Sequence, residues 1–201
     1  MKIPFKFLTA VAMAVLIILP AVAWAGGNHS TVNKSIRIDD NSTTGSVDSV
    51  NGSIRIGAGS FVESVESVNG SIDLGNDVTA DGRVEAVNGA ISLEPGCEVG
   101  GDVETVNGGI RMENTRVSGD VETINGQIRI LDGSEITGNV IVRESKGWNL
   151  DKRRKPVRVE IGRDVLVHGD LIFKHAVELK LHDTAKVGEI IGDEVEMVGG
   201  S

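Results

Sequence analysis

The sequence predicts an all-β fold, a single-stranded parallel β-helix (β-solenoid) with about 18 residues per coil and roughly eight coils. Three observations predict it. The stretch TINGQIRI at 123–130 recurs in closely similar form along the first two thirds of the chain. The other copies lie at 31–38, 49–56, 67–74, 86–93 and 105–112. Successive copies follow one another every ~18 residues, a period too short for a pair of helices, and their apolar and polar residues alternate as in a strand with one buried face.

Residues 1–25 have the features of a secretory signal peptide. Two lysines lead into an apolar run at 7–20, and small residues around Ala25 follow. The run is shorter than the ~20 residues that span a bilayer, and an uncleaved membrane anchor is the alternative interpretation. No cysteine directly follows the cleavage site, so a lipoprotein anchor is not expected. We expect a cleaved Sec-type signal and a mature bacterial protein, residues 26–201, that is periplasmic, at the cell surface or secreted, without a transmembrane segment.

The composition excludes several classes of protein. The formal net charge is -9 for the whole chain and -11 without the two lysines of the leader, so binding to nucleic acid is not expected. Aromatic residues make up only 3%, so stacked aliphatic side chains must supply the core of what we expect to be one domain. The single cysteine, Cys97, cannot form an intramolecular disulfide, and it is interpreted as an apolar filler in a turn or as a thiol that links two chains.

Each short, three-strand coil is predicted to include a Val strand and an Ile strand that meet at an Asn-Gly corner. Valine precedes the Asn by four positions and isoleucine follows it by three, so both strands bury one face. Stacked Asn amides can hydrogen-bond along the column, and the glycines are expected to allow a positive φ. These ladder residues are Asn33, Asn51, Asn69, Asn88, Asn107, Asn125, Gly52, Gly70, Gly89, Gly108 and Gly126. Independent type I′ hairpins are the alternative, but they do not explain the constant period. In the first copy Lys34 replaces the glycine, as expected of a capping coil.

Beyond the last full copy the motif changes. Asn-Gly coils are predicted for 26–142, a basic loop insertion for 143–158 and terminal coils for 159–201, which together give a rod about 40 Å long. Six-residue apolar steps resemble the left-handed hexapeptide helix, whereas the usual handedness of parallel crossovers favours the opposite hand. The prediction is a right-handed coil.

The runs GDVETVNGGIR at 101–111 and GDVETINGQIR at 119–129, in coils of short strands, resemble two groups of proteins. One is the bactofilin group of polymer-forming bacterial proteins, and the other is the adhesin-like solenoids of bacterial envelopes. The resemblance covers about four fifths of the mature chain and implies a rigid, non-enzymatic rod that associates with copies of itself. Bactofilins typically work in the cytoplasm, so the export signal fits the adhesin-like envelope proteins better.

Acidic residues three positions before each Asn form a candidate interaction surface. They are Asp48, Glu66, Glu85, Glu104 and Glu122. In a solenoid they make one column of like charges, which is mildly destabilising. One interpretation is a solvated face whose repulsion is relieved by the arginines of the next strand. The other is a docking stripe for cations or for a basic partner.

The predicted loop at 143–158 is the second candidate interaction site, because it carries a cluster of basic residues in an acidic protein. The cluster includes Trp148, Lys152, Arg153, Arg154 and Lys155. Loops that interrupt a solenoid project from one face and often bind. We hypothesise that this loop engages the acidic column of a neighbouring molecule or an anionic envelope polymer; a solvated excursion is the alternative.

Few residues suggest chemistry. Asp102 and Asp120 occupy matching positions in successive repeats and could form a carboxylate pair like that of glycosidases. His168, His175 and His182 recur at a constant spacing that does not match the coil period, so they are expected to face solvent rather than a metal. No catalytic residue, metal or cofactor is predicted.

The sequence therefore predicts a non-enzymatic, exported structural, scaffold or adhesin-like β-helix of the bacterial cell envelope that associates with itself. An envelope polysaccharide or another envelope protein is a further possible partner. The alternative function is that of a polysaccharide-binding or polysaccharide-cleaving β-helix protein.

Overall fold

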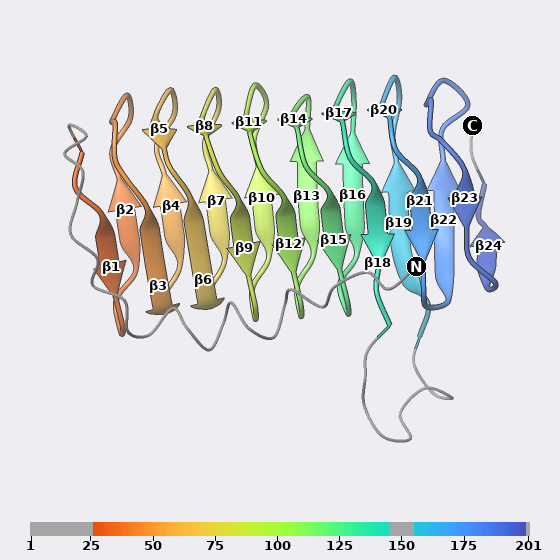
Figure 1. The fold of residues 1–201 in the computed structure, drawn as a ribbon, viewed down its shortest axis with the longest axis horizontal. Coiled ribbons are helices and arrows are strands. Elements are labelled where there is room, and N and C mark those ends of the chain that lie inside the picture. The colour runs from red at the N-terminus through yellow and green to blue at the C-terminus, as the bar shows by residue number, and fades with distance from the viewer. Residues whose placement is uncertain (1–25, 145–154, 200–201) are drawn as a thin grey trace.

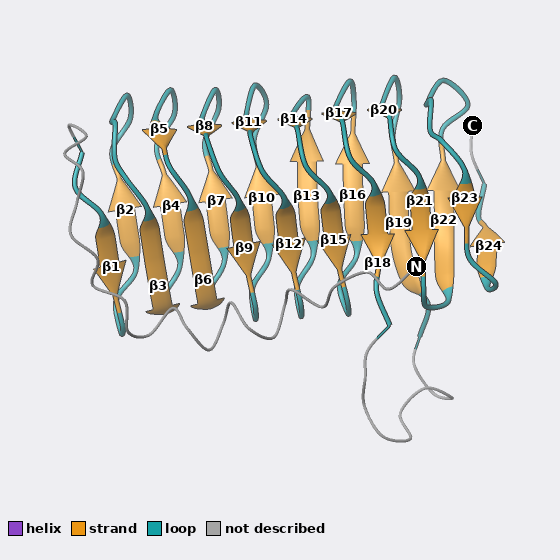
Figure 2. Ribbon diagram, in the orientation of Figure 1, coloured by secondary structure: helices purple, strands orange, loops and turns teal. Residues whose placement is uncertain are grey.

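The computed structural model describes residues 26–144 and 155–199, and this part of the chain contains strands but no helix. The strands form three sheets, which we name A, B and C, along one rod (Figures 1 and 2). Sheet A contains, in spatial order, β1 (His29–Thr31), β3 (Val47–Asn51), β6 (Val65–Asn69), β9 (Val84–Ala86), β12 (Val103–Thr105), β15 (Val121–Thr123), β18 (Val140–Val142), β21 (Leu171–Phe173) and β23 (Ile190–Ile191).

Sheets B and C complete each coil. Sheet B contains β2 (Ile36–Ile38), β4 (Ile54–Ile56), β7 (Ile72–Leu74), β10 (Ile91–Leu93), β13 (Ile110–Glu113), β16 (Ile128–Leu131), β19 (Val157–Ile161), β22 (Val177–Leu181) and β24 (Val195–Met197). Sheet C contains the short strands β5 (Phe61–Val62), β8 (Thr79–Ala80), β11 (Glu98–Val99), β14 (Arg116–Val117), β17 (Glu135–Ile136) and β20 (Leu166–Val167).

The predicted parallel solenoid is confirmed by the register. Each strand pairs in parallel with the equivalent strand of the next coil, as when Val47 pairs with Val65 and Val65 with Val84, so that every pairing advances the chain by one repeat. Sheets A and B contain nine strands each, so the chain makes eight complete turns between the first and the last strand of either sheet. Identical or similar side chains are therefore stacked at roughly 4.8 Å along the rod.

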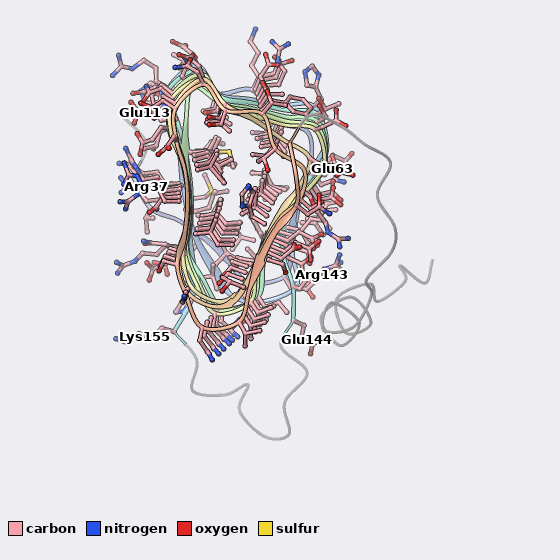
Figure 3. The ribbon with its side chains drawn as sticks, turned by 90° about the vertical axis from the view of Figure 1, so that its left-hand side faces the viewer. Arg37, Glu63, Glu113, Arg143, Glu144 and Lys155 are labelled. Atoms are coloured by element: carbon pink, nitrogen blue, oxygen red, sulfur yellow. The ribbon has the colours of Figure 1, made fainter. Side chains whose placement is uncertain are left out.

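The coil is right-handed, as predicted. Figure 3 looks along the rod from the N-terminal end, with sheet B and its Arg37 on the left and sheet A on the right. Strands run downward in sheet A and upward in sheet B while the chain advances away from this viewpoint (Figure 1). The chain thus turns clockwise as it recedes, which defines a right-handed helix.

Aliphatic columns fill the interior. The second strands of successive coils place Ile54, Ile72, Ile91, Ile110 and Ile128 on one another, all at most 1% exposed. Cys97 belongs to this core, and its Sγ lies 3.0 Å from the carbonyl oxygen of Gly75. Burial raises the pKa of the Cys97 thiol to about 11, so the thiol stays protonated inside the rod.

The predicted insertion at 143–158 leaves the stack in register. Val140 pairs with Leu171 and Ile128 with Val159, so both sheets skip the same length of chain across the insertion. The strand β19 already begins at Val157, just before the predicted start of the terminal coils. Residues 145–154 lie outside the described part of the chain, as does the predicted signal peptide at 1–25.

The expected reason for the corner glycines is wrong. None of the five has a positive φ. Instead, a Cβ at Gly52 would lie 2.3 Å from the carbonyl oxygen of Lys34 in the preceding coil, and at Gly108 it would lie 1.9 Å from that of Gly89. The coils approach so closely at this corner that only a residue without a side chain fits. Lys34 is tolerated because its Cβ points out of the N-terminal end, where no coil of the described chain precedes it.

A different corner, after the sheet B strands from β2 to β19, carries the left-handed residues. They are Asn41, Gly59, Asp77, Gly96, Asn114, Asp132, Gly133 and Asp164, with φ between 22° and 84°. Asn, Asp and Gly tolerate this region better than other residues. The sequence does contain a signal for this corner, a column of Asn, Asp and Gly, but it is less regular than the Asn-Gly motif.

Candidate functional site

Asp48, Glu66, Glu85, Glu104 and Glu122 form the acidic column, one outward-facing carboxylate per coil on sheet A. The register places each of them against the next along the rod. Beyond Glu122 the column continues with the apolar residues Ile141 and Ile172. The structure therefore brings the five predicted residues together as a continuous line at strand spacing.

Two arginines that flank strands of sheet A, Arg83 directly before β9 and Arg143 directly after β18, neutralise part of this column. The Arg83 guanidinium donates to Oε1 of Glu66 at 2.6 and 2.9 Å and lies 3.6 Å from Oε2 of Glu85. Arg143, at the far end, donates through Nε to Oε1 of Glu122. Arg143 projects from the sheet A side of the rod (Figure 3). Among the described side chains, Asp48 and Glu104 make no ion pair within the column.

The expected relief by arginines of the next strand is wrong. Those arginines lie on the outer face of sheet B, and their partners are acids of the same sheet. Arg55 pairs with Asp73 at 3.1 Å, Arg111 with Glu113 at 2.8 Å and Arg129 with Glu160 at 2.8 Å. Sequence reasoning missed Arg83 and Arg143, although Arg83 stands out as a basic residue two positions before Glu85.

The column is also less solvated than the first interpretation assumed. Glu85 is 6% exposed and Glu122 only 1%. Burial, followed by the charges of Glu122, Glu85 and Asp102, raises the pKa of Glu104 to about 8. Burial, followed by the charge of Glu66, raises the pKa of Asp48 to about 6. The two carboxyls without an ion-pair partner thus resist ionisation, because their charged form has lost water and faces like charges.

Replacing Glu104 with glutamine is expected to stabilise the rod at neutral and alkaline pH. The folded pKa is raised, so the parent loses stability as pH rises from the ordinary glutamate value of about 4.3 to about 8. The glutamine variant escapes this loss. We expect a gain of about 1 kcal/mol at pH 8, allowing for the solvent that still reaches the half-buried carboxyl, and no gain at pH 4.

Urea unfolding at both pH values measures this difference. A Glu98→Gln variant is the control, because it removes an exposed carboxylate from β11 in sheet C and should not reproduce the gain. Equal effects of the two substitutions at pH 8 would contradict the repulsion in the column.

The six ladder asparagines lie at the exposed corner between sheets A and B. Each amide nitrogen donates to the side-chain oxygen of the preceding coil, at 3.0, 2.8, 2.9, 2.8 and 2.7 Å from Asn51 to Asn125. The chain of hydrogen bonds spans all six coils without interruption. It fastens each coil to the next where the backbones approach most closely.

Asp102 and Asp120 form part of a second ladder, at the corner before sheet A. Oδ1 of Asp102 accepts the backbone N–H of Asp120 at 2.9 Å, and Oδ1 of Asp120 accepts that of Asn139 at 2.7 Å. Asn139 and Asp170 repeat the contact in the next two coils. Both carboxylates therefore hold backbone amides of the following coil.

Two of the three predicted histidines, His168 and His182, form hydrogen bonds with different partners. Nε2 of His168 is 2.9 Å from Glu135, and Nδ1 of His182 is 3.1 Å from the hydroxyl of Thr184. No group of three or more His, Cys, Asp or Glu side chains within 26–144 and 155–199 is placed to hold a metal ion.

Only the two ends of the predicted basic loop, 143–144 and 155–158, belong to the described residues. Trp148, Lys152, Arg153 and Arg154 lie outside the described residues. Lys155 is exposed and lines an open groove of about 400 Å³ together with Gly126 and Gln127. Arg158 pairs with Glu178 at 2.9 Å.

Neither protein-family models nor curated proteins nor solved structures match this chain. Within the described residues, no helix is long and apolar enough to cross a membrane.

Proposed function

We propose that this chain is a non-enzymatic structural rod of the bacterial cell envelope that works by associating with copies of itself, as a scaffold or an adhesin-like element. The observation that carries the proposal is the position of exposed apolar side chains. In the described part of the chain, the large ones lie in the first and last coils. They are Val32 (60% exposed), Ile190 (41%), Ile191 (38%), Met197 (56%) and Val198 (39%).

The backbone at the two ends supports the same proposal. Within the described chain, β1 and β2 have a hydrogen-bonded neighbour on one side only, and so do β23 and β24. Their free edges present unpaired N–H and C=O groups, which are a template for strands of another molecule. Apolar side chains beside free strand edges favour end-to-end contact.

The sides of the rod, in contrast to its ends, are charged. Sheet B and the adjoining turns are covered by charged side chains, many of them in ion pairs such as Arg129 with Glu160 and Lys180 with Glu160. Figure 3 shows most of the side-chain nitrogen and oxygen atoms around the outside of the coil and mainly carbon in its interior. Such flanks keep rods soluble and discourage unspecific lateral aggregation.

The envelope as the site of action is part of the proposal, supported by the signal-like order of features at 1–25. The resemblance to bactofilins and adhesin-like solenoids supports an architectural role.

Sedimentation of the purified chain over a range of concentrations tests the proposal. We expect the weight-average mass to rise with concentration from that of one chain, because the end contacts are intermolecular. A strict monomer over the whole range would count against a self-associating rod.

A further inference from the structure

The first coil places a polar and a charged residue in two columns of the stack, His29 in sheet A and Lys34 at the corner, while Ile36 and Ile38 keep the apolar pattern in sheet B. His29 pairs with Val47 and thus begins a column that continues with Val65 and ends at Ile190. Lys34 occupies the column of the corner glycines, and its Cβ points out of the N-terminal end, by analogy with Gly52, whose Cβ would meet the carbonyl oxygen of Lys34. A coil of the Asn-Gly type therefore cannot lie in front of Lys34 without displacing it.

The last coil keeps the apolar pattern of the interior. Ile190 pairs with the fully buried Leu171, and Met197 pairs with the fully buried Leu179. In the interior these columns are covered by the next coil, but here Ile190 and Met197 are 41% and 56% exposed. Solenoids usually end in a coil with a polar outer face. At the N-terminal end His29 and Lys34 supply part of such a cap, whereas the last described coil continues the apolar columns with Ile190 and Met197.

We propose that the C-terminal end is the self-association surface and that it binds the C-terminal end of a second copy, which closes a two-fold dimer. The inference rests on the proposed self-association and adds its polarity. The occupant of this surface must offer two strand edges at the separation of sheets A and B, with apolar residues between them. A coil of this same chain has that cross-section.

A two-fold axis perpendicular to the sheets satisfies these requirements. It pairs β23 with β23 and β24 with β24 of the other copy, in antiparallel orientation, and buries Ile190 and Met197 from both sides. It also places the acidic corner with Asp193 and Glu194 against the turn of the other copy that carries Lys186. Because the contact is self-complementary, it ends at two copies.

A head-to-tail chain of rods is the competing arrangement. The acidic residues of the last coil would then face Lys34 and Arg37 of the next copy, which is favourable for charge. It would, however, bury His29 against Ile190 and direct the Lys34 side chain into the backbone of the preceding coil. We therefore infer the two-fold arrangement, and the experiment separates the two.

End-specific charges provide the first test. The full chain with Ile190→Glu and Met197→Glu is expected to associate at least about a hundredfold more weakly than the parent, since each copy would bury two carboxylates. The Val32→Glu variant, which changes an exposed apolar residue at the other end, should associate as the parent does. Circular dichroism checks that the variants keep their strands. Equal weakening by the Val32 substitution would overturn the polarity, whereas a monomeric parent would overturn the proposed function itself.

Cross-linking gives a test that does not depend on weakened binding. In a Cys97→Ser background, Ile191→Cys chains alone should be joined by a short bis-maleimide reagent, because the two-fold axis brings the two copies of β23 together. A head-to-tail contact continues the column from Ile191 to Ser30 of the next copy. Cross-links that form only after mixing with Ser30→Cys chains would overturn the two-fold arrangement.

Discussion

Replacing Gly108 with alanine is expected to lower the free energy of unfolding by about 3 kcal/mol. The added Cβ would lie 1.9 Å from the carbonyl oxygen of Gly89 and 2.5 Å from its carbonyl carbon. Both are backbone atoms held between neighbouring strands, so relief requires the two coils to separate at this corner. That separation also lengthens the hydrogen bond between Asn107 and Asn88, which is 2.8 Å in the parent. Urea unfolding measures the loss.

Gly27→Ala is the matched control for this substitution. No atom lies within 4 Å of the Cβ that alanine would add there, and its φ is not positive. We expect a change within about 0.5 kcal/mol, because alanine at an unstrained site affects mainly the unfolded chain. If the two variants had equal stability, the close approach of the coils would be wrong.

Replacing Arg143 with methionine is expected to destabilise the rod by about 3 kcal/mol at pH 8. Glu122 is 1% exposed and has Arg143 as its ion-pair partner, so the substitution leaves a buried carboxylate without a counter-charge. Burial already raises the pKa of Glu122 in the parent, and loss of the guanidinium will raise it further. The destabilisation should therefore shrink as pH falls through that raised pKa, where the carboxyl is neutral.

A double variant completes the thermodynamic cycle. Glu122→Ile extends the isoleucine column that begins at Ile141, so the pair Glu122→Ile and Arg143→Met removes both charges together. We expect the double variant to be as stable as the parent within about 1 kcal/mol, or more stable, because hydrophobic replacement avoids the desolvation of the ion pair. If the double variant lost as much stability as the two single variants together, the coupling between Glu122 and Arg143 would be contradicted.

The periodic part of the fold could be predicted from the sequence because each position of the repeat keeps the same kind of residue, which indicates whether that position is buried or exposed. Val, Ile and Asn recur at fixed positions, and a parallel stack is the arrangement that places like residues on one another. The spacing between successive asparagines reappears as the register of sheets A and B. A coil of three short strands was expected, but the third strand carried no motif of its own, so the residues of sheet C were not assigned.

The electrostatics of the candidate surface could not be predicted in the same way. The acids recur in every copy of the repeat from the second onward. Their ion-pair partners, Arg83 and Arg143, are single residues that the repeat does not contain. The buried Glu122 is paired with Arg143, which lies at the edge of the predicted loop and is not part of the repeat. The corner glycines show the same limit, since positive φ and lack of space both select glycine, and only the distance between coils separates them.

Small-angle scattering on the associated protein tests the central claim, association through the ends of the rod, most directly. End-to-end association predicts that the maximum dimension grows to about two lengths of one rod, while the cross-sectional radius of gyration stays that of the single coil. An increase of the cross-section at an unchanged maximum dimension would show that the rods associate through their sides, and would contradict the account.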